Sequence, residues 1–121
     1  MAFVQYEGTE AYVAAIVDVD VDPTQHSVRV TRVCVAHDCG LIVNPDALRG
    51  TIEANLVQSL SRSLFEEVAF DRSSVTSVDW RTYPVARASD IPAQVDVVLL
   101  NRPELPPGGA GEPSSRATAA A

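Results

Sequence analysis

EAYVAAIVDVD, residues 10–20, carries the clearest structural pattern in the chain. Its side chains alternate along the segment and many are β-branched, which is typical of a β-strand with one buried face. Residues 22–27, DPTQHS, favour a turn. A second alternating segment follows at 28–35, with an irregularity expected near Thr31 and Arg32. Together these segments predict a β-hairpin whose loop is longer than the tight two-residue type.

A long helix is predicted after the hairpin. Asn44 can cap a helix N-terminus, and Pro45 suits the first helical position. Beyond them, apolar residues recur at spacings of three and four as far as about Glu67, which predicts one apolar stripe. The stripe consists of Leu48, Ile52, Leu56, Val57, Leu60, Leu64 and Phe65. Because Gly50 weakens a helix interior by roughly 1 kcal/mol relative to Ala, we expect the main helix to begin near Gly50.

The elements that follow are shorter. Strands are expected at 68–70 and 75–80, and a loop follows them because two X-Pro steps disfavour helical geometry. Residues 95–100 alternate again and predict the last strong strand. A loop covers 101–113, and a second helix is expected from Ser114, or the residue after it, through the terminal alanines.

A chain of 121 residues predicts one domain, residues 1–121, with a core of its own. The order of hairpin, helix, further strands and second helix predicts an α+β fold. We expect a mixed or antiparallel sheet, a long amphipathic helix and a truncated C-terminal helix. The last expectation follows because the alanine-rich run 117–121 provides only about one helical turn.

The composition argues against several classes of protein. The formal net charge is -7, all 9 basic residues are Arg and none is Lys, which argues against nucleic-acid binding. No apolar run approaches the roughly 20 residues of a transmembrane helix. Residues 1–4 lack the basic and apolar regions of a signal peptide. The compartment stays open: this segment taken alone indicates the cytoplasm, and an export signal on a preceding segment would place the protein in the periplasm.

The glycine-rich loop 108–113, GGAGEP, is the strongest candidate site. Glycine permits close backbone approach, and a loop before a helix N-terminus can present N–H groups to an anion. Glu112 could act as a general base if its surroundings tune its carboxylate. The alternative interpretation is a flexible loop whose Glu is stabilised beside a helix N-terminus. The loop lacks the Lys of a phosphate-binding loop and the full spacing of a dinucleotide fingerprint.

Gln58 is a second candidate, at the edge of the apolar stripe of the long helix. Its amide offers both donors and an acceptor, so it could recognise a polar heterocycle. The alternative is a solvated amide at the helix edge.

Cys34, His37 and Cys39 are of the residue types that bind metals or act as nucleophiles, but their spacing does not support either role. A single Cys-x4-Cys pair does not fit the spacing of zinc sites, so we expect no metal ligand among these side chains. Cys34 fits its strand as a small buried residue. A hydrolase based on His37 and Cys39 stays open as a third alternative, although neighbouring positions do not supply the orienting group and oxyanion site it needs.

Taken in order, several of these segments resemble the molybdenum-cofactor subunit of the xanthine dehydrogenase/aldehyde oxidase family. The resemblance rests on residues 35–45 (VAHDCGLIVNP), 52–58 (IEANLVQ), 64–67 (LFEE), 90–97 (DIPAQVDV) and 109–113 (GAGEP). Residues 2–6 and 37–40 are most similar to the isoquinoline 1-oxidoreductase β-subunit type. The similarity covers essentially the whole chain and corresponds to the C-terminal portion of such a protein.

The resemblance implies part of a molybdenum hydroxylase, which oxidatively hydroxylates N-heterocycles or aldehydes. It implies that Glu112 is the general base and that Gln58 contacts the pterin. It also places the backbone of Gly109, Ala110 and Gly111 beside the cofactor. That cofactor is a molybdenum-pterin, either molybdopterin or its cytosine dinucleotide form. No metal ligand is expected among the side chains of this chain.

The implied partners are the remaining part of the molybdenum subunit, a small iron–sulfur subunit that carries the clusters, and a small aromatic heterocycle or aldehyde as substrate. The chain departs from the family pattern at two places: it has Ala54-Asn55 where members often have Gly-Gly or Gly-Asn, and Ser59-Leu60-Ser61 where they have small glycines just past the Gln. We expect the isolated 121-residue chain to be inactive. The alternative is a non-catalytic truncated or split fragment that acts as a folding or interaction module.

Overall fold

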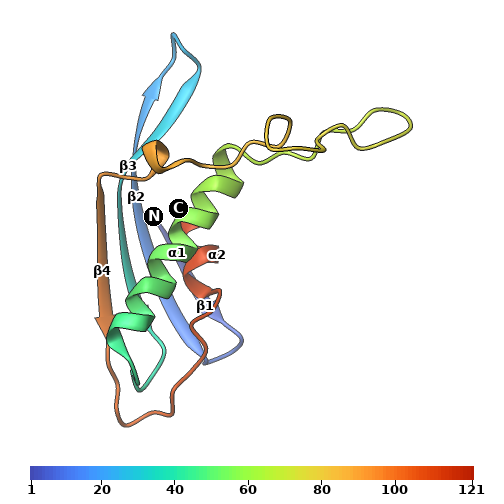
Figure 1. Ribbon diagram of the computed structural model, residues 1–121. Coiled ribbons are helices and arrows are strands. Elements are labelled where there is room, and N and C mark those ends of the chain that lie inside the picture. The colour runs from blue at the N-terminus through green and yellow to red at the C-terminus, as the bar shows by residue number, and fades with distance from the viewer.

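Four strands form one mixed sheet whose order follows the chain, and two helices cover one of its faces (Figure 1). The computed structural model describes all residues from 1 to 121. The elements are β1 (Ala2–Tyr6), β2 (Ala11–Asp22), β3 (Ser27–Asp38), α1 (Pro45–Leu64), a 3-10 turn η1 (Ala88–Asp90), β4 (Gln94–Leu100) and α2 (Pro113–Ala120). The predicted α+β class, with a mixed sheet, a long helix and a short C-terminal helix, is confirmed.

The predicted hairpin is formed by β2 and β3, which pair antiparallel along their whole length. Asp18 lies opposite Arg32 and Val19 lies opposite Val30, so Thr31 is the extra residue of a β-bulge. The hydroxyl of Thr31 donates to the carbonyl oxygen of Asp18 at 3.2 Å. The irregularity expected from the sequence is therefore present.

The outer strands differ from what the sequence suggested. β1 pairs antiparallel with β2 and was not predicted, because five residues at the edge of a sheet leave little periodic signal. β4 pairs parallel with β3, since the chain crosses over through α1 between them. The second strand is longer than the predicted 28–35: β3 continues to Asp38, because β2 and β4 both provide partners for its last residues.

The helix α1 is continuous over 20 residues. The side chain of Asn44 accepts a hydrogen bond from the Ala47 N–H at 3.0 Å, and Pro45 occupies the first turn, as predicted. The prediction of a start near Gly50 was wrong, because the cap and the packed stripe outweigh the cost of one glycine. The helix also ends at Leu64, before the predicted Glu67.

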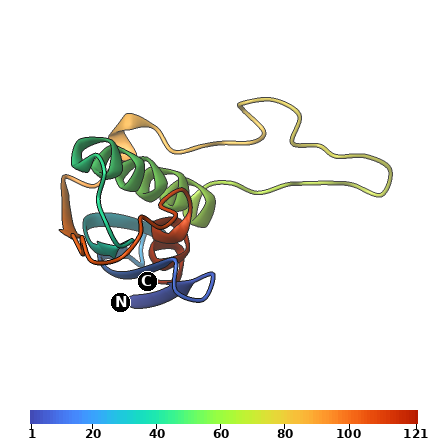
Figure 2. The ribbon, with the colours of Figure 1, turned by 90° about the horizontal axis from the view of Figure 1, so that it is seen from below.

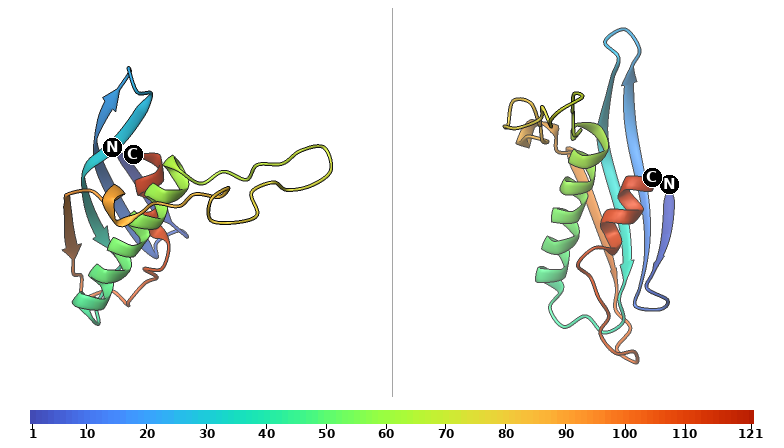
Figure 3. Two further views of the ribbon diagram at one scale, coloured as in Figure 1. Left: turned by 45° about the horizontal axis from the view of Figure 1, so that its top comes forward. Right: turned by 90° about the vertical axis from the view of Figure 1, so that its right-hand side faces the viewer.

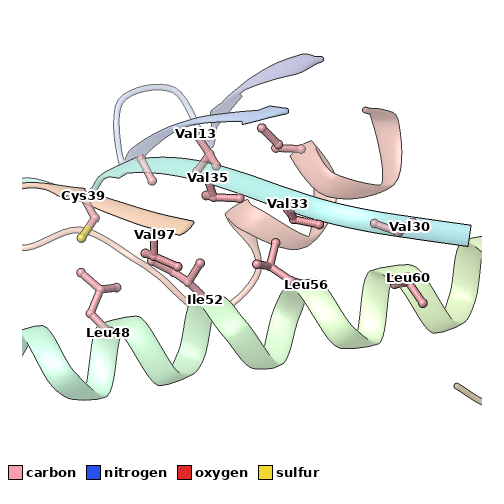
Figure 4. Packing of buried hydrophobic residues seen from close by; sticks show 13 residues of the cluster. Val13, Val30, Val33, Val35, Cys39, Leu48, Ile52, Leu56, Leu60 and Val97 are labelled. Atoms are coloured by element: carbon pink, nitrogen blue, oxygen red, sulfur yellow. The ribbon is translucent and has the colours of Figure 1, made fainter. Parts of the chain in front are cut away.

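The core lies between the helices and the covered face of the sheet (Figure 4). Ile52 of α1 is fully buried against it, and Leu48, Leu56 and Leu60 follow along the same side of the helix. Each buried side chain of this size contributes roughly 1.5–3 kcal/mol. The predicted stripe extends too far along the helix, because Leu64 at its C-terminal end is 39% exposed.

Between α1 and η1 the chain makes a long excursion away from the rest of the molecule (Figures 1 and 2). The strands expected at 68–70 and 75–80 do not form, which corrects the prediction, since the only pairing is an isolated bridge between Phe70 and Val75. Without a neighbouring sheet, turns organise this segment. The carboxylates of Asp71 and Asp79 accept backbone N–H bonds, and these bonds lower the pKa of both side chains.

The C-terminal helix α2 begins at Pro113, one residue before the predicted start. It packs beside α1 and against β1 and β2, so both helices lie on the same side of the sheet (Figure 3). Neither α1 nor α2 has the combination of length and apolar character that a bilayer-crossing helix requires.

Candidate functional site

Glu112 stands where the loop after β4 enters α2. Its neighbour Pro113 is buried, and so is Ser114, which anchors the backbone at this point. The side chain of Glu112 is nevertheless 70% exposed. The fold therefore fixes the backbone position of Glu112 and leaves the oxygens of its carboxylate accessible.

A polar depression of about 420 Å³ lies between α1 and the start of α2. No apolar residue lines it. Its lining consists of Asn55, Gln58 and Arg62 from α1, and Gly111, Glu112, Ser115 and Arg116 from the loop and α2. The structure thus brings together three of the residues named from the sequence, Gln58, Gly111 and Glu112, although 54 residues separate the first from the last.

Buried polar side chains fix the loop to the long helix. The amide nitrogen of Asn55 donates to the Gly111 carbonyl oxygen at 2.8 Å and to the Ser114 hydroxyl at 3.0 Å. One turn later, the Ser59 hydroxyl donates to the Ser115 carbonyl oxygen at 2.9 Å. Because Asn55, Ser59 and Ser114 are buried, these bonds are shielded from water and hold the depression in shape.

Gln58 lies on the wall of the depression formed by α1 and is exposed. Its side-chain oxygen accepts from Arg62 at 3.4 Å, and the same guanidinium reaches the Ser115 hydroxyl at 3.4 Å. The amide oxygen of Gln58 is therefore oriented by Arg62, and its amide hydrogens remain available for a ligand. Arg62 was not identified from the sequence, although the spacing of four residues on one helix was the signal that could have found it.

Two side chains that were not identified from the sequence contact Glu112. The Tyr6 hydroxyl donates to Oε2 of Glu112 at 3.3 Å, and Arg116 approaches the same oxygen at 3.8 Å. The Arg116 guanidinium also lies 4.7 Å from the centre of the Tyr6 ring. Desolvation, followed by the nearby carboxylates of Glu7 and Glu112, raises the pKa of the Tyr6 hydroxyl. Arg116 follows Glu112 by four residues, whereas nothing in the sequence points to Tyr6.

The other two residues of the predicted loop site face elsewhere. Gly109 lines a second depression of about 580 Å³, together with Glu10, Asp38 and Arg102. A Cβ at Gly109 would lie 3.3 Å from the Glu10 carboxylate. Ala110 is half-buried and packs against the hydrophobic core. Successive residues of the loop therefore border one depression, the core and the other depression in turn, and only Gly111 and Glu112 face the Gln58 side.

The candidate residues on β3 lie apart from this depression. His37 is fully buried, neither ring nitrogen has a hydrogen-bond partner, and burial lowers its pKa. Cys39 is also buried, and its burial, with the nearby Asp38 carboxylate, raises the pKa of its thiol. Cys34 is half-buried on its strand and so less buried than expected. No group of three or more His, Cys, Asp or Glu side chains is placed to hold a metal ion.

Comparison with known proteins identifies the family. The model of the molybdopterin cofactor-binding domain matches residues 4–92. The B subunit of nicotinate dehydrogenase from Pseudomonas putida is 44% identical over 111 residues, which is 92% of this chain and 9% of that protein. The beta subunit of isoquinoline 1-oxidoreductase from Brevundimonas diminuta is 29% identical over 100 residues, or 83% of this chain and 12% of that one.

Solved structures agree with the sequence relatives. Quinoline 2-oxidoreductase from Pseudomonas putida 86 superimposes with a TM-score of 0.83 at 25% identity, over 91% of this chain and 14% of that one. The Cu,Mo-CO dehydrogenase shares the fold with a TM-score of 0.78 at 20% identity, over 90% of this chain and 14% of that one. The chain spans about a tenth of the length of the relatives it matches. It belongs to the molybdopterin cofactor-binding domain family, which confirms the resemblance seen in the sequence.

Proposed function

We propose that this chain is the part of a molybdenum hydroxylase that contacts the pterin of the cofactor and supplies the general base, Glu112. The observation that carries the proposal is the position of Glu112. It is an exposed carboxylate beside Gly111, in a depression lined only by polar residues and held to α1 by buried hydrogen bonds. The proposed substrates are small aromatic N-heterocycles or aldehydes, since relatives are named for nicotinate, isoquinoline and aldehydes.

The residues present fit a molybdenum-pterin cofactor. The depression offers the amide of Gln58, the guanidinium groups of Arg62 and Arg116, and the hydroxyl of Ser115, which suit the polar edge of a pterin ring and the phosphate of molybdopterin. A Cβ at Gly111 would meet nothing within 4 Å, so there is open space over this part of the loop. The volume of about 420 Å³ is within the usual range for small-molecule sites.

We assign a separate role to each group. Gln58 would hold the pterin through its amide, with its orientation set by Arg62. The backbone of Gly111 would lie beside the cofactor in this depression, and the cofactor would extend along the loop to the backbone of Gly109 and Ala110 outside it. The cofactor is molybdopterin or its cytosine dinucleotide form. When bound, this cofactor would supply the oxidising centre that takes two electrons from the substrate carbon. Glu112 would accept the proton that is released at that centre, as a positioned general base does.

The proposal includes partners outside this chain. The depression is open to solvent on the side of Glu112, so a further wall has to come from the remaining part of the molybdenum subunit. We propose that a small iron–sulfur subunit receives the electrons through its clusters. The isolated 121-residue chain should therefore purify without stoichiometric molybdenum, which elemental analysis can measure.

The central test is Glu112→Gln in the complete hydroxylase. A general base contributes roughly 10²–10⁴-fold, so turnover should fall by at least about a hundredfold while the molybdenum content stays unchanged. Glu104→Gln, in the same loop and also exposed, is the matched control and should retain turnover. Normal turnover in Glu112→Gln would remove the base assignment and favour the alternative, a non-catalytic folding or interaction module.

A further inference from the structure

Glu112 is held by other side chains, although its own side chain is 70% exposed. Its contacts bring together the two ends of the chain. β1 and α2 lie side by side, with the two termini next to each other (Figure 3), so Tyr6 at the end of β1 lies close to the first turn of α2. The Tyr6 hydroxyl reaches Glu112 across 106 residues of sequence. The packing of α2 on β1 therefore decides which groups surround this carboxylate.

Both contacts are made to the same oxygen of the carboxylate. The Tyr6 hydroxyl donates to Oε2 of Glu112 at 3.3 Å, and a guanidinium nitrogen of Arg116 lies 3.8 Å from that oxygen. No hydrogen bond or ion pair within the chain reaches Oε1. An ionised carboxylate only accepts hydrogen bonds, so both contacts suit the form of Glu112 that can take up a proton. The two oxygens therefore differ, with Oε2 held by the protein and Oε1 free to react.

The ring of Tyr6 also holds the second of these groups. The Arg116 guanidinium lies 4.7 Å from the ring centre, which is close enough for a cation–π contact. Tyr6 is anchored at its base, because its ring packs against the core and its backbone pairs with Ala11 of β2. Tyrosine combines such an apolar body with a polar tip. Tyr6, Glu112 and Arg116 thus form a triangle in which each side chain contacts the other two.

The triangle matters because each contact alone is weak. An exposed ion pair four residues apart on a helix gains little, since water screens it and two long side chains have to be ordered. Here the anchored Tyr6 ring orders both partners at once. A reacting group that is already held in position does not have to be ordered again in each turnover. Exclusion of water, once the rest of the subunit closes the depression, would strengthen both contacts to Oε2.

We propose that Tyr6 and Arg116 are positioning residues for Glu112, which hold Oε2 so that Oε1 is the oxygen that accepts the proton. The inference rests on the proposed role of Glu112 as general base and names the groups that orient it. Tyr6 does not line the depression, so its effect on the reaction should act through Glu112. Arg116 does line the depression, so its test has to separate the orientation of Glu112 from cofactor binding.

The first test uses the 121-residue chain and needs no cofactor. Three-bond NMR couplings across the Cα–Cβ bond of Glu112 should report a single rotamer, despite the exposure of this side chain. In the double variant Tyr6→Phe, Arg116→Gln the same couplings should become averaged over several rotamers. Glu104, which is exposed in the same loop and makes no ion pair, is the control and should be averaged in both chains. Averaged couplings for Glu112 in the unchanged chain would overturn the inference.

The second test uses the complete hydroxylase. Tyr6→Phe removes one hydroxyl and keeps the ring, so kcat should fall by about tenfold while KM and the molybdenum content stay within about twofold. Tyr12→Phe is the matched control, because the Tyr12 hydroxyl makes no hydrogen bond to Glu112, and it should retain kcat. If Glu112→Gln is inactive and Tyr6→Phe has normal kcat, the positioning role is wrong and the general base stands. Normal turnover in Glu112→Gln would instead remove the proposed function itself.

Arg116 is tested by two substitutions in the same enzyme. Arg116→Gln should lower kcat by about tenfold at unchanged molybdenum content, and Arg116→Lys, which keeps the positive charge, should recover most of that loss. Arg29→Gln removes an exposed charge from the hairpin and should behave as the unchanged enzyme. In the 121-residue chain, Arg116→Gln should also raise the pKa of Tyr6 further, because the Arg116 charge lowers it. A loss of molybdenum that parallels the loss of kcat would contradict the positioning role of Arg116 and assign it to cofactor binding.

Discussion

Asn55 of α1 donates a hydrogen bond to the carbonyl oxygen of Gly111, 56 residues later in the chain, at 2.8 Å. The same amide nitrogen reaches the Ser114 hydroxyl. This buried side chain therefore sets the position of the backbone on both sides of Glu112. The proposed general base therefore depends on a buried polar residue of α1 that lies beside the apolar stripe.

Asn55→Ala should loosen this loop. The substitution leaves the buried Ser114 hydroxyl and the Gly111 carbonyl without their partner, so the free energy of unfolding should fall by about 1–3 kcal/mol. Chemical denaturation measures the loss, and amide hydrogen exchange in residues 109–115 should become faster. Glu53→Ala, an exposed position on the same helix, should stay within about 0.5 kcal/mol of the unchanged chain. An unchanged stability for Asn55→Ala would show that these bonds do not hold the loop.

Glu112→Gln should lower the pKa of the Tyr6 hydroxyl towards its ordinary value. Desolvation and Glu7 also raise that pKa, so part of the shift should remain. NMR of the Tyr6 ring carbon attached to oxygen follows the titration, with Tyr12 as the control residue in the same chain. A Tyr6 titration that does not change would mean that its hydroxyl and the Glu112 carboxylate are not in contact in solution.

Acid should destabilise the fold through His37. Burial lowers the pKa of this imidazole in the folded chain, so the unfolded chain binds a proton first as the pH falls. The stability due to the neutral imidazole is complete above about pH 6.5 and declines below it, by up to about 1.4 kcal/mol per pH unit, until the folded pKa is reached.

His37→Leu should remove this pH dependence, because the two unpartnered ring nitrogens are replaced by an apolar group. His26→Gln, in the exposed hairpin turn, should leave the dependence in place. Urea denaturation between pH 5 and pH 7, a range chosen around the ordinary His pKa of about 6.5, provides the comparison. Parallel curves for the unchanged chain and His37→Leu would exclude His37 as the source.

The same substitution at two glycines should have opposite effects. At Gly108 a Cβ would overlap the backbone carbonyl of Glu10, and the Gly108 N–H donates to Cys39 O at 2.7 Å, so Gly108→Ala should cost about 1–3 kcal/mol. Gly50 lies in α1 with open space around it, so Gly50→Ala should stabilise by about 0.5–1 kcal/mol. Thermal melting of both variants tests the pair, and a stabilising Gly108→Ala would contradict the close packing of this loop.

Local patterns were sufficient for the elements that depend on near neighbours. The alternation in residues 10–20 and 28–35 predicted the hairpin, and even its bulge, because strands that are adjacent in sequence pair through a short turn. Asn44 and Pro45 marked the true start of α1, and the weak interior propensity of Gly50 was misleading. A cap acts within one turn and is visible in sequence, whereas the packing that overrides a glycine is not.

The sequence allowed the residues of the candidate site to be predicted, but not the packing that brings them together. Gln58 and Glu112 were chosen from their types and neighbours, and only the packing of α2 beside α1 places them in one depression. Tyr6 escaped notice because it belongs to a short edge strand, and it reaches Glu112 from the opposite end of the chain.

The hairpin, the capped long helix, the glycine-rich loop and the carboxylate of that loop were all readable from residue patterns. Four other features arose only from packing between distant segments: the parallel pairing of β4, the position of β1, the separation of Gly109 from Gly111, and the exposure of the second sheet face. The reason is physical. Turns, caps and periodicity act over a few residues, but strand order and helix packing depend on the burial of apolar surface between segments that are far apart in the chain.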